Sequence, residues 1–294
     1  MFQERQTTFG WLVSADLFLS ATGGGVFLIS FILDLLNKYE PVARIGGILG
    51  PILVLIGASF LVAEIGSKAK LYKLFFNFNL SSWMSRGTWI LTIFIIFGLA
   101  YSLTAFTAFG WLPWSKATAL GLGIGMVAAL FAGLATSYTG FLFGVVKGIP
   151  FWNMPILPLL FFLSGLCTGI AIILAIASFY NTIGVTGFHQ LGAAGTVLIL
   201  LQLLALGGYL EIARHSGVTS AESVHLLKTP LFIGGVVMVG LLVPFCLLAY
   251  SLAVRNMLIL SILGGVSSVL LLIGGLFQRY CIVRAGVSRP LCCT

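Results

Sequence analysis

The sequence predicts an all-α, polytopic membrane protein with eight transmembrane helices. Hydrophobic residues make up 60% of its 294 residues, charged residues only 7%, and the mean hydropathy is +1.14. A soluble domain carries about 25% charged residues, so this composition excludes a soluble protein. A membrane barrel is excluded because its strands would appear as segments of roughly ten residues with alternating hydrophobicity. The sequence shows long, continuous apolar runs instead.

Each of the apolar runs is long enough to cross about 30 Å of hydrocarbon as a helix. The first run follows a segment without the short apolar core and cleavage site of a signal peptide, so we expect it to be retained. The second ends at Glu64 and leads into a basic, aromatic connector, 66–86. Among the other connections, only 214–229 is long. The expected helices occupy residues 10–36, 43–65, 87–110, 117–146, 155–180, 190–213, 230–254 and 257–283.

An internal similarity divides these helices into two bundles of four in parallel orientation. Residues 17–30 resemble residues 161–174, and the second and sixth helices end in the similar tripeptides Ala-Glu-Ile and Leu-Glu-Ile. We expect the first bundle to comprise residues 1–148 and the second to comprise residues 149–294.

The same similarity predicts which bundle carries the functional site. Glu211 in the second bundle corresponds to Glu64 in the first, whereas Asp16 corresponds to Leu160. Because the second bundle lacks a counterpart of Asp16, we expect the functional site in the first bundle.

An even number of helices places both termini on one side of the membrane, here called face A, and the opposite side is face B. Face A carries many more basic residues than face B, which predicts that face A is cytoplasmic. A basic docking surface for a partner would give the same bias. The basic residues assigned to face A are Arg5, Lys68, Lys70, Lys73, Arg86, Lys147, Arg214, Lys228, Arg279, Arg284 and Arg289; those of face B are Lys38, Arg44, Lys116 and Arg255.

Three carboxylates, those of Asp16, Glu64 and Glu211, lie in the predicted helices toward face A, and Tyr138 lies at a similar depth. A carboxylate inside hydrocarbon is expensive and usually functional. Residues that merely snorkel would be expected at both faces. We therefore expect these groups to converge on one polar cavity near face A. The alternative for Glu64 is a snorkelling residue beside an ordinary basic loop.

Other residue patterns narrow the chemistry. The run Gly23–Gly25 is explained by close helix packing, by room for a flat ring beside Asp16, or by both. A haem between membrane helices usually needs a pair of axial histidines within apolar runs. The three histidines lie at helix ends or in a loop, so no haem is expected. No Cys-x-x-Cys pair is present, so iron–sulfur and zinc sites are not expected either. The histidines are His189, His215 and His225.

Four segments resemble the polysulfide reductase membrane-subunit family, also called NrfD-type: residues 11–27, 63–91, 137–169 and 270–286. The most specific parts read Ser-Trp-Met-Ser-Arg-Gly-Thr-Trp in the second segment and Pro-Phe-Trp-Asn, followed by Leu-Pro, in the third. The family consists of quinone-binding integral subunits of multi-subunit oxidoreductases. Such a subunit anchors an iron–sulfur protein, which exchanges electrons with a molybdenum-type or other catalytic subunit.

The resemblance implies that a quinone (menaquinone or ubiquinone) binds against Asp16, Glu64 and Tyr138, with Gly24 and Arg86 also at the site and no metal or haem bound. Related proteins often have histidine at the position of Asp16. Quinone reduction takes two electrons and two protons, and each quinone oxygen needs a donor when reduced and an acceptor when oxidised. A tyrosine hydroxyl and a carboxyl group can both serve in this way.

We therefore expect a quinone-binding anchor subunit of a respiratory oxidoreductase complex in the cytoplasmic membrane. The connector 66–86, with Lys68, Lys70 and Lys73, is the expected docking surface for the iron–sulfur subunit. A second hypothesis is a proton-coupled secondary transporter that uses the membrane carboxylates. Transporter sites lie near the bilayer midplane, whereas these carboxylates are expected near one face.

Overall fold

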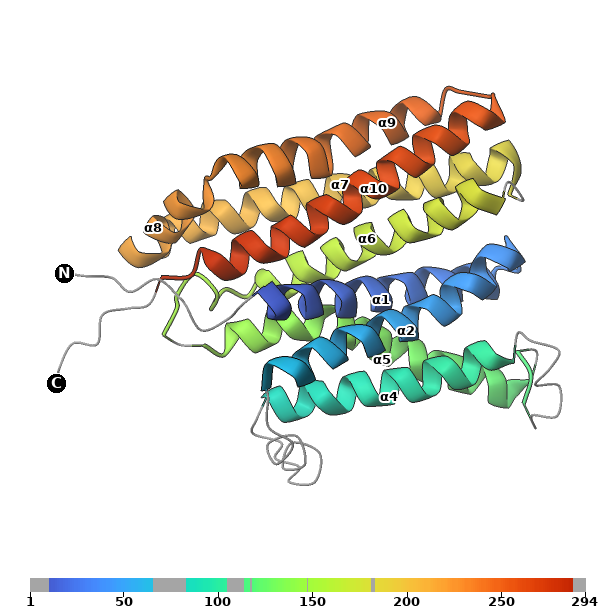
Figure 1. Ribbon diagram of the computed structural model, residues 1–294, viewed down its shortest axis with the longest axis horizontal. Helices are drawn as coiled ribbons and strands as arrows, with labels where there is room; N and C mark the ends of the chain where they lie inside the picture. Colours follow the sequence, from blue (N-terminus) through green and yellow to red (C-terminus); the bar gives the residue numbers. More distant parts are fainter. Residues whose placement is uncertain are drawn as a thin grey trace.

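The computed structural model describes residues 11–65, 83–104, 114–116, 118–146, 148–180 and 183–287, apart from the side chains of Glu64, Ile65 and Met84. Within these ranges, eight helical spans are long and apolar enough to cross a membrane. They run side by side along the long axis of the molecule (Figure 1). The predicted fold class, an all-α membrane protein with eight spans, is confirmed.

The first four spans are α1 (Trp11–Leu35), α2 (Glu40–Ile65), α4 (Trp83–Leu103) and α5 (Ala119–Gly144). The next two are α6 (Leu157–Tyr180) and α7 (Gly184–His215), and the last is α10 (Met257–Arg284). Two bounds differ most from the predicted ones: α4 ends at Leu103 instead of 110, and α7 begins at residue 184 instead of 190. Its first turns contain glycine, threonine, histidine and glutamine, so they lack the apolar signal that locates the other spans.

The seventh span and the connector before it differ from a simple helix and loop. The span consists of a π-helix, η2 (Leu231–Leu242), continued by α9 (Val243–Ser251). The sequence predicts a loop for the preceding connector, but the connector contains α8 (Val218–Leu227). This short helix follows Gly217, whose φ of +130° suits glycine. It buries Val224 and Leu227 beside two serines, and this pattern is too short for composition alone to reveal.

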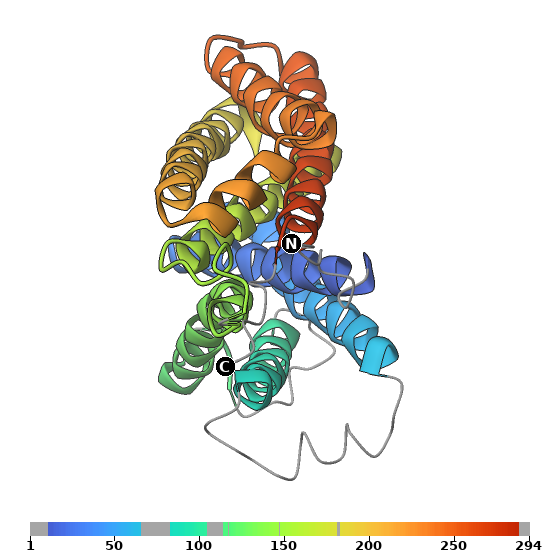
Figure 2. The same cartoon turned by 90° about the vertical axis from the view of Figure 1, so that its left-hand side faces the viewer.

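The helices form two groups, which Figure 2 shows as the lower and upper halves of the molecule. In the first group, α1 packs on α2 and α5, and α4 packs on α2 and α5. In the second group, α10 packs on α6, η2 and α9, and α7 packs on α6 and α9. The groups meet where α1 contacts α6 and α10 and where α5 contacts α6. The internal repeat itself stays a prediction.

The run Gly23–Gly25 explains how α1 can touch three helices at once. A Cβ added at the first glycine would lie 2.5 Å from the carbonyl oxygen of Gly50 in α2. At the second it would lie 2.7 Å from the carbonyl oxygen of Ala132 in α5, and at the third it would collide with the backbone of Gly165 in α6. Small residues allow such close approach of membrane helices, so α1 is the centre of the fold.

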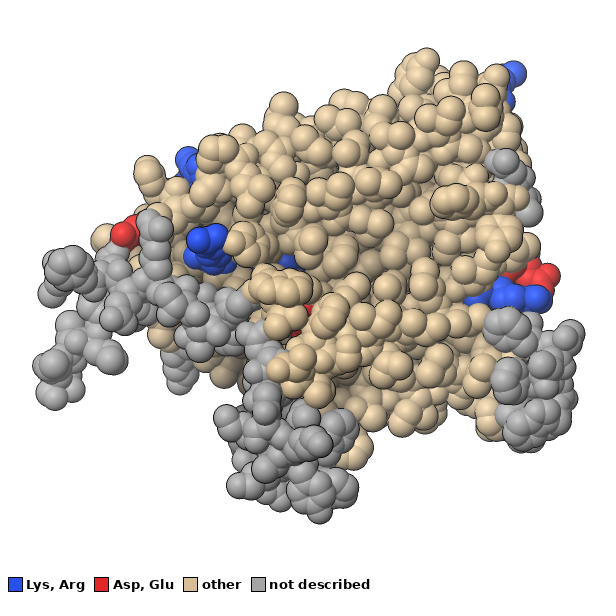
Figure 3. Space-filling model, in the orientation of Figure 1, with Lys and Arg blue, Asp and Glu red and all other residues tan. Residues whose placement is uncertain are grey.

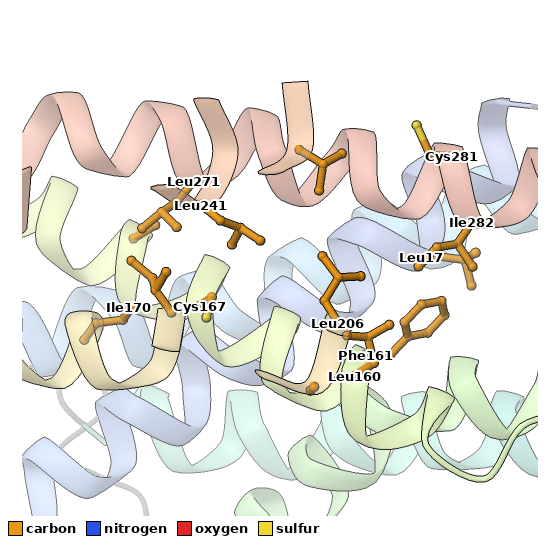
Figure 4. Packing of buried hydrophobic residues seen from close by; sticks show 14 of the residues in the cluster. Leu17, Leu160, Phe161, Cys167, Ile170, Leu206, Leu241, Leu271, Cys281 and Ile282 are labelled. Carbon is orange, nitrogen blue, oxygen red and sulfur yellow. The ribbon is translucent and has the colours of Figure 1, made fainter. Parts of the chain in front are cut away.

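The buried hydrophobic side chains form two clusters. The larger cluster spans both groups, and Figure 4 shows Leu17 of α1 beside Phe161 of α6 and Ile282 of α10. The smaller cluster lies within the first group and is mainly aromatic: the ring of Phe27 packs edge-on against that of Phe94, with 5.3 Å between centroids. Van der Waals packing of this kind stabilises membrane helices, because lipid gives little hydrophobic driving force.

Candidate functional site

A small cavity lies near the face-A end of the first group, the end where α1 begins and α10 ends. Its volume is about 100 Å³, and all four helices of the group contribute to it. Two of the lining groups are titratable, Asp16 of α1 and Tyr138 of α5, and both are buried. The remaining lining residues are Val13, Leu17, Leu61, Thr88, Leu142, Phe143 and Val146.

Asp16 lies in the cavity wall with a neutral hydrogen-bond donor beside it. Its side chain is 1% exposed, and Ser20, one turn further along α1, donates a hydrogen bond of 3.0 Å to Oδ1. Among the described residues, no lysine, arginine or histidine forms an ion pair with it. A buried carboxyl group with a single neutral donor keeps unused hydrogen-bonding capacity, and this capacity is available to a ligand in the cavity.

Two glycines make room for the titratable side chains, and neither is among the residues predicted from the sequence. A Cβ added at Gly57 of α2 would lie 3.1 Å from Oδ1 of Asp16. A Cβ added at Gly87 of α4 would lie 2.5 Å from the ring of Tyr138. Both glycines therefore let a neighbouring backbone close over the cavity.

Asp16 and Tyr138 both line the cavity, whereas Gly24 and Arg86 do not. Gly24 packs against α5 and does not line the cavity. Arg86, in the first turn of α4, lies with its guanidinium 4.8 Å from the ring centroid of Trp83. The side chain of Glu64 lies outside the described residues. The same is true of most of the connector 66–86, including its three lysines.

The expected convergence of three carboxylates on one cavity is wrong for Glu211. Its side chain is 61% exposed and forms an ion pair of 3.4 Å with Arg214, while His215 lies 3.6 Å away. Because α7 continues to His215, these partners occupy the i+3 and i+4 positions on the outer surface of its last turn.

A fourth carboxylate, which is not among the predicted site residues, lies at the opposite end of α1. Asp34 accepts hydrogen bonds from the hydroxyl of Tyr101 and from Nζ of Lys116, the latter at 2.7 Å. It lines a wider cavity of about 640 Å³ at face B. Membrane carboxylates are therefore not confined to one face. Asp34 lies so close to the end of its helix that its position in the sequence does not indicate a role inside the membrane.

A second correction concerns Arg279, whose predicted place is among the basic residues of face A. Its side chain is only 1% exposed. It donates a hydrogen bond of 3.2 Å to Oγ1 of Thr139 and one of 3.0 Å to the carbonyl oxygen of Phe161. Of the described residues with charged side chains, only Asp16 and Arg279 are buried. Elsewhere on the face drawn in Figure 3, lysine, arginine and acidic residues lie mainly at the two ends of the molecule.

The second group contains a buried, neutral polar network. Oε1 of Gln278 in α10 accepts hydrogen bonds from Ser164 in α6, at 3.2 Å, and from Gln202 in α7, at 3.1 Å. Its members are amides and hydroxyls, so the network contains no titratable group. Within the described ranges, no three His, Cys, Asp or Glu side chains gather as metal ligands would.

Comparison with known proteins identifies the family of this chain. The family model described as "Polysulphide reductase, NrfD" matches residues 1–290. The chain is similar to "Protein NrfD" of Escherichia coli K12, with 28% identity over 195 residues, covering 59% of this chain and 60% of that protein. It is also similar to the C subunit of the polysulfide reductase of Wolinella succinogenes, with 26% identity over 175 residues, or 55% of each protein.

A further relative is "Protein NrfD homolog" of Haemophilus influenzae, with 26% identity over 189 residues, covering 58% of this chain and 59% of that protein. The matched part thus spans less than two thirds of the length of each of these relatives.

Proposed function

Because the chain belongs to the polysulphide reductase NrfD family, we propose that it is the quinone-binding membrane subunit of a respiratory oxidoreductase complex. The family makes it a membrane subunit of a redox complex. Quinone binding, an iron–sulfur partner and a molybdenum-type catalytic subunit beyond that partner are the further parts of the proposal.

The observation that carries the proposal is the pair of titratable groups, Asp16 and Tyr138, on an otherwise mostly apolar cavity. A quinone head group is a flat apolar ring with two oxygens, so it needs apolar walls and polar groups that both donate and accept. A carboxyl and a phenol hydroxyl meet this requirement. When bound, a quinone would supply two-electron, two-proton redox chemistry.

The protein's own contribution is to hold and move protons at defined atoms. Ser20 fixes Oδ1 of Asp16, which leaves Oδ2 as the atom that gives or takes a proton. Tyr138, held against the backbone at Gly87, offers its hydroxyl as the second donor. The leucine and valine side chains of the wall exclude water, so proton transfer depends on these two groups.

We propose that electrons enter from face A, because the cavity lies near that end of the first group. The connector 66–86 remains the proposed docking segment for the iron–sulfur subunit, since it combines lysines with aromatic residues. Changing Lys68, Lys70 and Lys73 to glutamate should release the partner and leave the membrane subunit inserted. A complex that survives this triple change would show that docking occurs elsewhere.

The test of quinone binding uses the intact complex and quinol-dependent electron transfer. Asp16→Asn and Tyr138→Phe should each lower turnover roughly 100-fold or more, the range for loss of a general acid or base. Ser137→Ala is the matched control, because Ser137 neighbours Tyr138 but bonds only to the backbone of its own helix. Full turnover in both site variants would overturn the proposed function.

A further inference from the structure

Arg279 is a buried cation to which the proposed function gives no role. An arginine side chain stays charged in proteins, and burying such a charge without a counter-ion is strongly unfavourable. Arg279 lies five residues before the end of α10, and Asp16 lies five residues after the start of α1. Both helix ends are at face A, so each charge lies about 8 Å along its helix from that end.

The contacts of Arg279 satisfy hydrogen bonds but supply no negative charge. Its two terminal nitrogens donate to a hydroxyl and to a backbone carbonyl, and its guanidinium lies 4.1 Å from the ring centroid of Phe161. Its Nε is buried and has no hydrogen-bond partner among the described residues. No carboxylate in the described ranges forms an ion pair with it. A positive potential is therefore left in this part of the interior.

One packing contact and one neighbouring position in the sequence connect this charge to the cavity of Asp16. Phe161, on which the guanidinium lies, packs edge-on against Phe143, with 6.3 Å between ring centroids, and Phe143 lines the cavity. Thr139, which accepts a hydrogen bond from Arg279, directly follows Tyr138 in α5. Figure 4 shows Leu17, which also lines the cavity, close to Phe161.

The charge thus lies one layer of side chains behind the cavity wall. In a protein interior of low dielectric constant, a charge acts strongly over such a separation. While Asp16 in the cavity wall is protonated, the effect on the cavity is to favour a ligand with negative charge over a neutral ligand of the same shape.

We propose that Arg279 is a positioning residue that makes this cavity selective for an anion, without touching the ligand. The inference rests on the proposed function and deepens it. A quinone bound here would gain negative charge on reduction. Arg279 would stabilise negative charge in the cavity, and Asp16 or Tyr138 would supply the proton that neutralises it. No bond of Arg279 forms or breaks, and its own proton is not transferred.

The experiment compares two ligands of nearly the same shape and different charge. The anion is 2-hydroxy-1,4-naphthoquinone, which is deprotonated at neutral pH, and the neutral ligand is 2-methoxy-1,4-naphthoquinone. Their dissociation constants are measured at pH 7 on the purified complex by isothermal titration calorimetry. The wild-type protein should bind the anion at least tenfold more tightly than the methoxy compound.

Three variants separate charge from structure. Arg279→Gln should weaken binding of the anion at least tenfold and binding of the neutral ligand less than threefold. Arg279→Lys retains the charge, and Thr139→Val removes one hydrogen bond but leaves the charge, so both should keep the preference for the anion within threefold.

Three outcomes would overturn the inference. They are a wild-type protein without preference for the anion, equal weakening of both ligands by Arg279→Gln, and loss of the preference in Arg279→Lys. If Arg279→Gln does not fold, the preference for the anion in the wild-type protein and in Arg279→Lys still tests the inference. A wild-type protein that binds neither ligand would instead show that the proposed quinone site is wrong, and this inference would fall with it.

Discussion

Helix α1 places a carboxylate near each of its ends, Asp16 toward face A and Asp34 toward face B, and each has a tyrosine nearby. At the face-B end, Asp34 is neutralised by Lys116 and accepts a second hydrogen bond from Tyr101. At the face-A end, Asp16 has one serine donor and shares an apolar cavity with Tyr138. The comparison shows that the partners of a membrane carboxylate, and not its depth alone, separate a structural role from a binding role.

An aromatic cluster lies between the two carboxylates of α1 and separates them. Phe27 and Phe31 lie on α1 between the carboxylates, and both rings pack edge-on against Tyr101. A transmembrane proton path normally needs titratable groups along its length. This packing gives no support to the transporter hypothesis and is in keeping with a proton supply to the cavity from face A.

The first prediction tests the difference in function, where the largest effect is expected. Asp16→Asn should lower quinol-dependent turnover of the complex roughly 100-fold or more, because it removes a proton donor and acceptor. Asp34→Asn should change turnover less than about threefold, because its carboxylate is already committed to Lys116. Steady-state kinetics of the two variants in the same membranes measures both. Equal losses would remove the distinction between the ends of α1.

The second prediction concerns stability. Here we expect the larger effect in Asp34→Asn and the smaller one in Asp16→Asn. Asp34→Asn leaves Lys116 without its counter-ion, and both side chains are only partly exposed (14% and 27%). We expect a loss of about 1–2 kcal/mol in the free energy of unfolding, less than for a fully buried pair. Asp16→Asn should change that free energy by less than about 0.5 kcal/mol, since none of the ion pairs among the described residues involves Asp16. Unfolding in mixed micelles measures both, and a larger loss in Asp16→Asn would contradict the comparison.

The third prediction alters the cavity without touching either carboxylate. Gly87→Ala places a methyl group against the ring of Tyr138, and overpacking of this kind typically costs about 1–3 kcal/mol. We expect affinity for 2-methoxy-1,4-naphthoquinone to fall roughly tenfold, since 1.4 kcal/mol corresponds to that factor. Gly123→Ala on α5 is the control, because an added Cβ there meets nothing within 4 Å. Unchanged affinity in Gly87→Ala would show that the ring position does not matter for binding.

The smallest effect is expected in the second group. Glu211→Gln removes an exposed carboxylate whose ion pair with Arg214 lies on the surface. Such pairs contribute about 0–1 kcal/mol. Turnover should therefore stay within about twofold of wild type, and the free energy of unfolding within about 1 kcal/mol. A loss of turnover comparable to that of Asp16→Asn would instead place Glu211 in the redox site.

Some of this structure could be predicted because long apolar runs are an unambiguous signal in a protein with so few charges. The spans follow from these runs, and the similar depth of Asp16 and Tyr138 follows from helix order. Their meeting at one site is implied by the family resemblance. Rotation about a helix axis does not follow from helix order or depth. Glu211 has the depth expected for a cavity residue, but its helix turns it outward, where Arg214 pairs with it.

Arg279 is a residue whose burial could not be predicted from the sequence. A basic residue near a helix end is normally assigned to the membrane surface, and the Gln-Arg-Tyr segment around Arg279 gives no sign of burial. Its position depends on a hydroxyl from α5 and a carbonyl from α6, more than a hundred residues earlier in the sequence. Contacts of this kind appear only when the helices are packed together.

The three glycines of α1 have a consequence for how the protein is made. Helix α1 comes first in the sequence among the eight described spans and is also the most enclosed of them, with 72% of its 18-residue apolar stretch buried in the finished fold. Its third glycine packs on the backbone of Gly165, which is synthesised 140 residues later (165 − 25). During that interval the surface of α1 at Gly25 is not yet covered by α6. Membrane insertion of this subunit therefore depends on α1 persisting as a helix until its later neighbours arrive.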